Sequence, residues 1–307
     1  MIRITNPERS LPFYTDIFNM TLVDKMEFKE WGFSLYYLAS MPPGAPWPEP
    51  GTEEAHRAMF GAQFATINLT HNHGDELKDG PVYHSGNEEP HRGFGHLAFT
   101  CEDVYASCAD LEAKGVAFQK KPDEGRMKGL AFAKDPDGYW LEIIKRPATE
   151  GLTGYWLNQT MMRIKDPAKS LPFYQGLGMS VIAERHFPDA KFSLYFLASL
   201  HDDVALPEDA SSPEAMSLTK VIRTSVLELT HNHGTETDEA FAYHNGCSDP
   251  KGFGHITFTV PDVAATVDTM RTAGVTIKKG VDDGTMKGLA FVYDPDGYEV
   301  ELLPHAW

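Results

Sequence analysis

The 307-residue sequence predicts an α+β fold that is built from four β-α-β-β-β units grouped into two like domains. The first observation behind this prediction is an internal repeat. The motif THNHG at residues 70–74 returns at residues 230–234, and the motif GFGH at residues 93–96 returns at residues 252–255. The second observation is the order of segments within each half. Two sets of short apolar segments follow one another, and each set contains one helical segment. This pattern is typical of curved, mixed sheets covered by few helices.

The spacing of the repeat defines the two halves. The motif SLPFY at residues 10–14 returns 160 residues later, whereas the motif DPDGY at residues 135–139 returns 159 residues later. One residue was therefore gained or lost within the unit. We expect domains at residues 1–147 and 155–307, because residues 147–154 contain Pro, Gly and Thr and form the natural linker.

The first unit is expected to begin with a strand and a helix. Ser10 is expected to cap a helix that runs to Phe18, with Pro12 in its first turn, where a missing backbone N–H loses no partner. The Pro-rich segment 41–50 and the helix-like segment 52–60 indicate a surface insertion. The expected strands of this unit are residues 1–4, 22–28, 33–39 and 65–70.

The second unit repeats this order. An amphipathic helix is predicted over residues 104–114, and Gly115 would end it. The expected strands of this unit are residues 96–101, 116–120, 130–133 and 139–145.

Composition and charge narrow the function. With 42% hydrophobic and 23% charged residues, the chain has the composition of a soluble globular protein without a membrane-spanning run. The net charge of −17 argues against nucleic acid and anionic membranes as partners. The first residues do not resemble a signal peptide, and Cys101, Cys108 and Cys247 lack the spacing of a disulfide framework. We therefore expect a cytoplasmic protein.

Three carboxylates interrupt strands that are otherwise apolar. Glu142 lies in the sequence Leu-Glu-Ile, Glu228 in Leu-Glu-Leu and Glu301 in Val-Glu-Leu. Burial of an unpaired carboxylate is costly, so each of these residues needs a cation or a set of hydrogen-bond donors.

Histidine and glutamine residues occur at similar places. His96 and His255 begin strands, and Gln159 lies in the strand at the head of the second half. A single strand histidine is more often a hydrogen-bonded core residue, but His, Glu, Glu and an amide at equivalent positions form a set of ligands suited to Zn²⁺ or Ni²⁺. The repeated His-x-His of residues 71–73 and 231–233 is instead interpreted as a structural loop, because glycine follows each copy.

Together these residues resemble the glyoxalase I (lactoylglutathione lyase) family of the vicinal-oxygen-chelate superfamily, in its two-domain single-chain form. The resemblance covers essentially the whole chain. Its most specific stretches are residues 92–96, 120–132, 135–142, 159–163 and 227–234.

The resemblance implies a pseudo-dimer whose halves share each metal site. One site would take Gln159 and Glu228 from the second half, with His96 and Glu142 from the first. The other would take His255 and Glu301, but there Asn68 replaces the glutamate and the glutamine position would fall two residues before Met1. We expect this second site to be inert.

The resemblance also implies residues that bind the glutathione part of the substrate. Its carboxylates would be held by Arg163, Asn232, Arg92, Lys120 and Arg126. At the second site the counterparts are expected to be Arg3, Asn72, Lys251, Lys278 and Thr285. An apolar wall would be formed by Phe187, Leu194, Phe196, Met127, Leu130 and Phe132.

The implied reaction is isomerisation of the hemithioacetal of glutathione and methylglyoxal to S-D-lactoylglutathione. A bound Zn²⁺ or Ni²⁺ acidifies the C–H next to the carbonyl, Glu142 removes that proton, and Glu228 could serve the other epimer. We expect a monomer that acts on this small molecule. Two alternatives share the fold: an extradiol dioxygenase, whose Fe²⁺ is held by two His and one Glu, and a sequestering protein without a buried ligand set.

Overall fold

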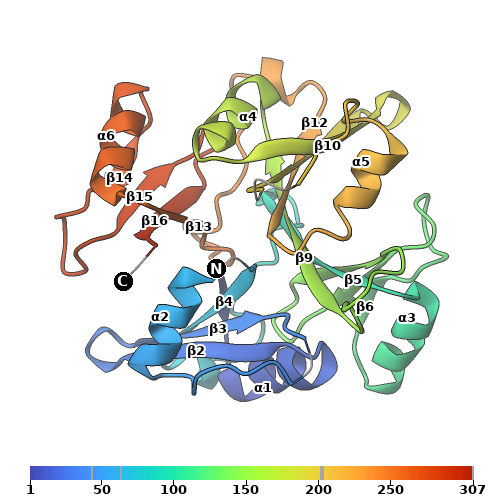
Figure 1. Ribbon diagram of the computed structural model, residues 1–307, viewed down its shortest axis with the longest axis horizontal. Coiled ribbons are helices and arrows are strands. Elements are labelled where there is room, and N and C mark those ends of the chain that lie inside the picture. The colour runs from blue at the N-terminus through green and yellow to red at the C-terminus, as the bar shows by residue number, and fades with distance from the viewer. Residues whose placement is uncertain (43, 63, 201–203, 306–307) are drawn as a thin grey trace.

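The structure, a computed structural model, describes residues 1–42, 44–62, 64–200 and 204–305 (Figure 1). The first half contains β1 (Ile2–Ile4), α1 (Pro7–Pro12), β2 (Thr21–Phe28), β3 (Phe33–Ala39), α2 (Glu53–Gly61), β4 (Thr66–Asn72), β5 (Phe94–Cys101), α3 (Val104–Ala113), β6 (Phe118–Lys120), β7 (Ala131–Lys134) and β8 (Trp140–Lys145). The second half contains β9 (Trp156–Ile164), α4 (Pro167–Gly176), β10 (Ser180–Phe187), β11 (Phe192–Ala198), α5 (Pro213–Leu218), β12 (Val226–Asn232), β13 (His255–Val260), α6 (Val263–Thr272), β14 (Ile277–Lys279), β15 (Ala290–Tyr293) and β16 (Glu299–Pro304).

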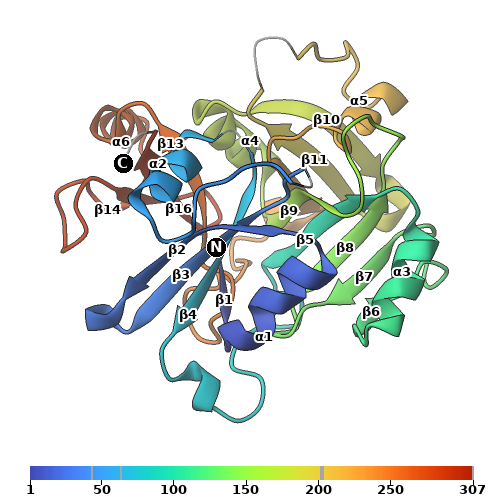
Figure 2. The ribbon, with the colours of Figure 1, turned by 60° about the horizontal axis from the view of Figure 1, so that its bottom comes forward.

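The largest sheet is shared by the two halves. Its order, β10-β11-β12-β9-β5-β8-β7-β6, joins the first unit of the second half to the second unit of the first half (Figure 2). Strands β5 and β9 make this junction as an antiparallel pair that runs from Phe94 opposite Met162 to Thr100 opposite Trp156. The expected pseudo-dimer of four units is therefore present, and its halves are continuous through one sheet.

The pseudo-equivalent junction is much shorter. The remaining described strands form two four-stranded sheets, β1-β4-β3-β2 and β13-β16-β15-β14. A single bridge between Ile2 and Phe253 connects them. The two halves are thus related by an approximate symmetry that holds for strand order but not for the length of the central pairing.

Glycine allows the two halves to approach closely at the pseudo-twofold axis. A Cβ atom on Gly93 would lie 1.9 Å from the carbonyl oxygen of His244, and one on Gly252 would lie 2.0 Å from that of His84. The phenylalanine rings that follow these glycines, Phe94 and Phe253, stack with centroids 4.9 Å apart. The repeated GFGH motif therefore holds the interface together as well as leading into a strand.

The predicted helix start at Ser10 is wrong. The N-cap of α1 is Asn6, whose side chain accepts a hydrogen bond from the N–H of Glu8, and Pro7 occupies the first turn. Asp166 caps α4 in the same way. The Asx residue before proline is the stronger capping signal, because its carboxyl or amide oxygen reaches the free N–H groups of the first turn.

The helix predicted at residues 52–60 exists as α2, but it is not a surface insertion. Met59 and Phe60 are buried in an apolar cluster with Val23 of β2 and Ala39 of β3. The helix therefore covers part of the first sheet. Across the described residues, no helix combines the length and the apolar character that a membrane crossing requires.

The segment between the halves is anchored by a buried cation. Arg146 is 1% exposed, and its guanidinium donates hydrogen bonds to the carbonyls of Thr100, Leu152 and Gly154 and to the carboxylate of Glu102. A buried arginine is tolerated when it is paired and hydrogen-bonded, as both terminal nitrogens of Arg146 are, although its Nε has no hydrogen-bond partner among the described residues. Arg146 thereby fixes the path that leads from β8 into β9.

Candidate metal centre

Strand register places four polar side chains on one face of the eight-stranded sheet. Directly paired residues point to the same face, and side chains alternate along each strand. Glu228 on β12 pairs with Met161 on β9, which pairs with His96 on β5. Gln159 lies two residues before Met161, and Glu142 on β8 pairs with the residue two positions after His96. The four predicted ligands, which come from four adjacent strands of both halves, therefore share a face.

Three of these residues meet closely. The Nε2 atom of His96 lies 3.4 Å from Oε2 of Glu142 and 3.6 Å from Oε2 of Glu228. One ligand atom from each residue lies within 4.8 Å of the other two. Two atoms that each bind the same ion at about 2.0–2.2 Å can be at most about 4.4 Å apart, so both measured separations suit one ion. Gln159 is 3% exposed on the neighbouring strand.

The charges of this cluster are unbalanced. Burial by itself lowers the pKa of His96, but the negative charges of Glu142 and Glu228 outweigh it and raise this pKa to about 9. Burial raises the pKa of Glu228, and the charge of Glu142 adds to that rise. Buried carboxylates of this kind require a counter-ion.

One ring nitrogen of His96 lacks a hydrogen-bond partner. Its Nε2 atom is buried and forms no hydrogen bond with any described residue. The ring is held edge-on against Phe132, with centroids 5.3 Å apart. An unpartnered nitrogen beside two carboxylates fits a divalent cation, which would satisfy the nitrogen and neutralise the charge.

The pseudo-equivalent position is incomplete. His255 Nε2 lies 3.3 Å from Oε2 of Glu301, and the hydroxyl of Thr257 donates a hydrogen bond of 2.9 Å to the same oxygen. Asn68 stands where the first site has a glutamate, and its Oδ1 accepts a hydrogen bond of 3.2 Å from Thr70. Within the described residues, the cluster of His96, Glu142 and Glu228 is the one group of three potential ligands that meets.

Two guanidinium groups lie near one end of the cluster. Arg163 is on the same face of β9 as Gln159. Burial, followed by the nearby charge of Arg92, lowers the pKa of Arg163 to about 10. Arg92 and Asn232 line a cavity of about 230 Å³, and the Nδ2 group of Asn232 donates a hydrogen bond of 2.8 Å to the hydroxyl of Tyr243. Three of the five predicted anion-binding residues therefore lie close together.

The other two predicted anion-binding residues differ from each other. Lys120 pairs with Phe132, which pairs with Glu142, so Lys120 shares the face of the ligands. Its ammonium group donates a hydrogen bond of 2.7 Å to the carbonyl of Leu130. Arg126 is exposed on the loop between β6 and β7. Only Lys120 is built into the sheet.

One predicted counterpart is wrong. Lys279, not Lys278, is equivalent to Lys120, because its ammonium group makes the matching hydrogen bond of 2.8 Å to the carbonyl of Leu289. Lys278 instead forms an ion pair with Glu299. The 159-residue offset of the later part of the repeat gives the correct pairing.

Most of the predicted apolar wall lies beside the ligands. Phe196 is 4% exposed and pairs with Glu228, and Phe132 pairs with Glu142. Leu194 packs on the cluster that contains Phe196, Leu130 is half-buried, and the ring of Phe187 stacks on Phe192. Met127 is 45% exposed, so its place in the wall stays a prediction. It lies on the polar loop after β6, where few apolar groups are available to cover it.

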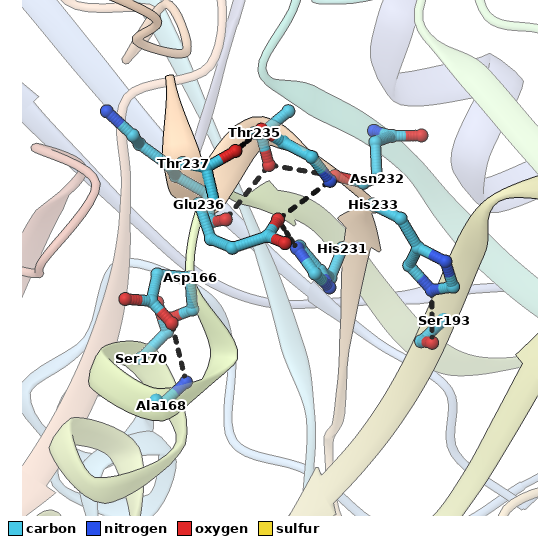
Figure 3. A network of polar contacts seen from close by, with 12 residues as sticks. Asp166, Ala168, Ser170, Ser193, His231, Asn232, His233, Thr235, Glu236 and Thr237 are labelled. Atoms are coloured by element: carbon cyan, nitrogen blue, oxygen red, sulfur yellow. Dashed lines mark hydrogen bonds and ion pairs between the residues drawn. The ribbon is translucent and has the colours of Figure 1, made fainter. Parts of the chain in front are cut away.

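The His-x-His motif is used in local structure, as predicted (Figure 3). His231 Nε2 lies 2.8 Å from Oε2 of Glu236, which also accepts a hydrogen bond from the N–H of Gly234. His233 Nε2 lies 2.8 Å from the hydroxyl of Ser193, in a different direction. Strand β12 runs through Asn232, so the motif ends the strand and does not follow it.

Comparison with known proteins agrees with this arrangement. A family model described as Glyoxalase/Bleomycin resistance protein/Dioxygenase superfamily matches residues 1–143 and 156–302. The chain belongs to this superfamily. Among its relatives, a lactoylglutathione lyase of Schizosaccharomyces pombe is 42% identical over 307 residues, which cover 99% of this chain and 94% of that protein. A glyoxalase I of Saccharomyces cerevisiae is 41% identical over 313 residues, with coverage of 99% and 90%.

A solved structure shares the two-domain architecture of this superfamily member. The crystal structure of glyoxalase I from Zea mays matches with a TM-score of 0.67 and 25% sequence identity. The match covers 99% of this chain and 90% of that one. The tandem arrangement is therefore common to both proteins.

Two residues near the site were not found from the sequence. Tyr243 holds Asn232, and Asn87 holds Arg163. The equivalent of Tyr243 in the first half is Tyr83, so a comparison of the two halves shows no difference that would single this tyrosine out. Asn87 could have been noticed from the sequence, because the two halves differ at this position, where the second half has Cys247.

Proposed function

We propose that this protein is a lactoylglutathione lyase that isomerises the hemithioacetal of glutathione and methylglyoxal to S-D-lactoylglutathione, and so removes methylglyoxal. The observation that carries the proposal is the buried meeting of His96, Glu142 and Glu228, contributed by both halves of the chain. Relatives at 41–42% identity over essentially the full length bear the names lactoylglutathione lyase and glyoxalase I.

Side chains from four adjacent strands, β12, β9, β5 and β8, would hold the metal ion. Gln159, His96, Glu142 and Glu228 are the proposed ligands, and Zn²⁺ is the proposed ion, with Ni²⁺ as the alternative that the ligand set also suits. When bound, the ion supplies Lewis acidity that polarises the oxygens of the substrate and acidifies the C–H next to its carbonyl.

Glu142 is proposed to move the proton. It takes the proton from the hydroxyl-bearing carbon and returns it to the neighbouring carbon, which was the carbonyl carbon. The proton of the original hydroxyl passes to the former carbonyl oxygen, so that the first carbon becomes the thioester carbonyl and the second carries the new alcohol. The hydrogen stays within the substrate and its base, so no redox cofactor is needed. Glu228, whose carboxylate also lies near His96, is proposed to serve the opposite epimer.

The remaining residues are proposed to bind and shield the substrate. Arg163, Arg92 and Asn232 hold glutathione carboxylates at one end, with Lys120 and Arg126 toward the other. The apolar wall proposed to exclude water from the reacting carbons consists of Phe187, Leu194, Phe196, Met127, Leu130 and Phe132. The position of His255, Glu301 and Asn68 is proposed to be inert, and the chain is proposed to act as a cytoplasmic monomer.

A direct assay tests this function. Purified protein that has been loaded with Zn²⁺ should convert the preformed hemithioacetal to thioester, measured by ultraviolet absorbance, and a chelator should abolish the conversion. Readdition of Zn²⁺ or Ni²⁺ should restore it. Oxygen uptake with a catechol substrate, or tight binding of the hemithioacetal without conversion, would instead favour one of the two alternatives within the fold.

Metal affinity should rise with pH. In the metal-free protein His96 remains protonated up to about pH 9, and a protonated imidazole cannot bind a metal ion. Each unit of pH below that value should weaken the apparent affinity about tenfold, and the raised pKa of Glu228 acts in the same direction. Competition with a chelator of known affinity at several pH values measures this slope. An affinity that does not change with pH would contradict the assignment of His96 as a ligand.

A further inference from the structure

A single side-chain difference separates the two copies of the anion-binding arginine. Arg163 and Arg3 are equivalent, and each donates from Nη1 to three backbone carbonyls. For Arg163 these belong to Gly86, Gly93 and Phe94, at 3.1–3.3 Å. For Arg3 they belong to Gly246, Gly252 and Phe253, at 3.0–3.1 Å. The backbone around the two arginines is therefore the same.

The second nitrogen of each guanidinium meets a different residue. Nη2 of Arg163 donates a hydrogen bond of 2.8 Å to Oδ1 of Asn87. Nη2 of Arg3 lies 3.8 Å from the Sγ atom of Cys247, the equivalent of Asn87. Sulfur is a weak acceptor, whereas an amide oxygen that accepts from a guanidinium forms a charge-assisted hydrogen bond. Arg163 thus has a stronger side-chain contact than Arg3.

The orientation of the Asn87 amide is fixed by its other contact. Its Nδ2 group donates a hydrogen bond of 2.5 Å to the carbonyl of Gly95. Because a carbonyl can only accept, the nitrogen must face Gly95 and the oxygen must face Arg163. Asn87 therefore connects the arginine to the residue that precedes His96 in β5.

Arg163 has donors left for a ligand. No described protein atom accepts a hydrogen bond from its Nε group, and the remaining hydrogen of Nη2 is also unused. The hydrogen bond from Nη2 to Asn87 fixes the plane of the guanidinium, and the direction in which the unused N–H groups point is fixed with it. We propose that Asn87 is a positioning residue that orients the Arg163 guanidinium toward a substrate carboxylate. This inference rests on the proposed function.

Variants of Asn87 test the proposal through the Michaelis constant. Asn87→Ala, and Asn87→Cys, which reproduces the sequence of the other half, should raise KM for the glutathione hemithioacetal about tenfold while kcat changes little. The dissociation constant of S-methylglutathione, an unreactive analogue, should rise by a similar factor. Cys247→Ala is the matched control and should leave both quantities unchanged.

A double-mutant cycle shows whether Asn87 acts through Arg163. In an Arg163→Lys background the planar group is missing, so Asn87→Ala should add little to the rise in KM. Thermal unfolding of each variant measures any loss of folded protein, which would lower apparent kcat and leave KM unchanged. An unchanged KM in both Asn87 variants, or additive effects in the cycle, would overturn the proposal. Failure of the unmodified, metal-loaded protein to turn over the hemithioacetal would overturn the proposed function instead.

Discussion

Replacement of Glu142 by glutamine should lower kcat at least ~10²-fold, the smaller effect expected for loss of a positioned acid–base group. Glutamine has nearly the same shape as glutamate but cannot accept the substrate proton. Because Glu142 lies 3.4 Å from Nε2 of His96, it is also a proposed metal ligand. The measurement is therefore steady-state turnover at saturating Zn²⁺, expressed per bound ion, so that a loss of metal is not mistaken for a loss of the base.

The duplicated chain supplies the control for this experiment. Glu301 occupies the equivalent strand position, beside His255 and Thr257. Glu301→Gln should leave turnover unchanged if only one of the two positions is active. Near-normal turnover in Glu142→Gln would show that another group is the base. Equal losses in the two variants would show that both positions contribute.

Removal of the His96 imidazole should abolish both metal binding and activity. His96 lies between two carboxylates, and Glu142 and Glu228 without it form a pair of buried negative charges with one ligand fewer. We expect one ion per chain in the unmodified protein and less than about a tenth of that in His96→Ala under the same conditions. Elemental analysis after gel filtration measures the stoichiometry.

His255→Ala is the matched variant at the other position. It should retain one ion per chain and full turnover, because the cluster at His255 lacks the third ligand found at His96. Two ions per chain in the unmodified protein, with one lost in each variant, would mean that both positions bind metal. That result would refute the proposed asymmetry of the molecule.

The repeat made the candidate ligands visible before the structure was known. Glu142, Glu228 and His96 could be singled out because each is a polar residue in an apolar strand and has a counterpart one repeat away. Strand positions were predicted well for the same reason, since alternation along a strand is a local pattern. The start of α1 was misplaced because two capping signals compete within four residues, and Asn6 before Pro7 prevails over Ser10.

Other features depend on contacts that no local pattern records. The burial of α2 and the exposure of Met127 depend on whether distant strands supply an apolar surface. Asn87 becomes significant only when its amide is seen between Arg163 and Gly95, which lie 76 and 8 residues away along the chain. Its sequence signal, the change to Cys247, cannot be interpreted without those contacts.

The sequence alone determined which residues are candidates for the site: a duplicated chain, with imidazole, carboxylate and amide side chains complete in one combination of halves and incomplete in the other. Tertiary structure decided where those ligands meet. The pairing of β5 with β9 brings residues of both halves onto one face of a continuous sheet, whereas β1 meets the segment before β13 at a single bridge, between Ile2 and Phe253. The physical reason is that side-chain type and strand alternation are local properties, whereas pairing between strands depends on backbone hydrogen bonds and packing between residues far apart in the chain.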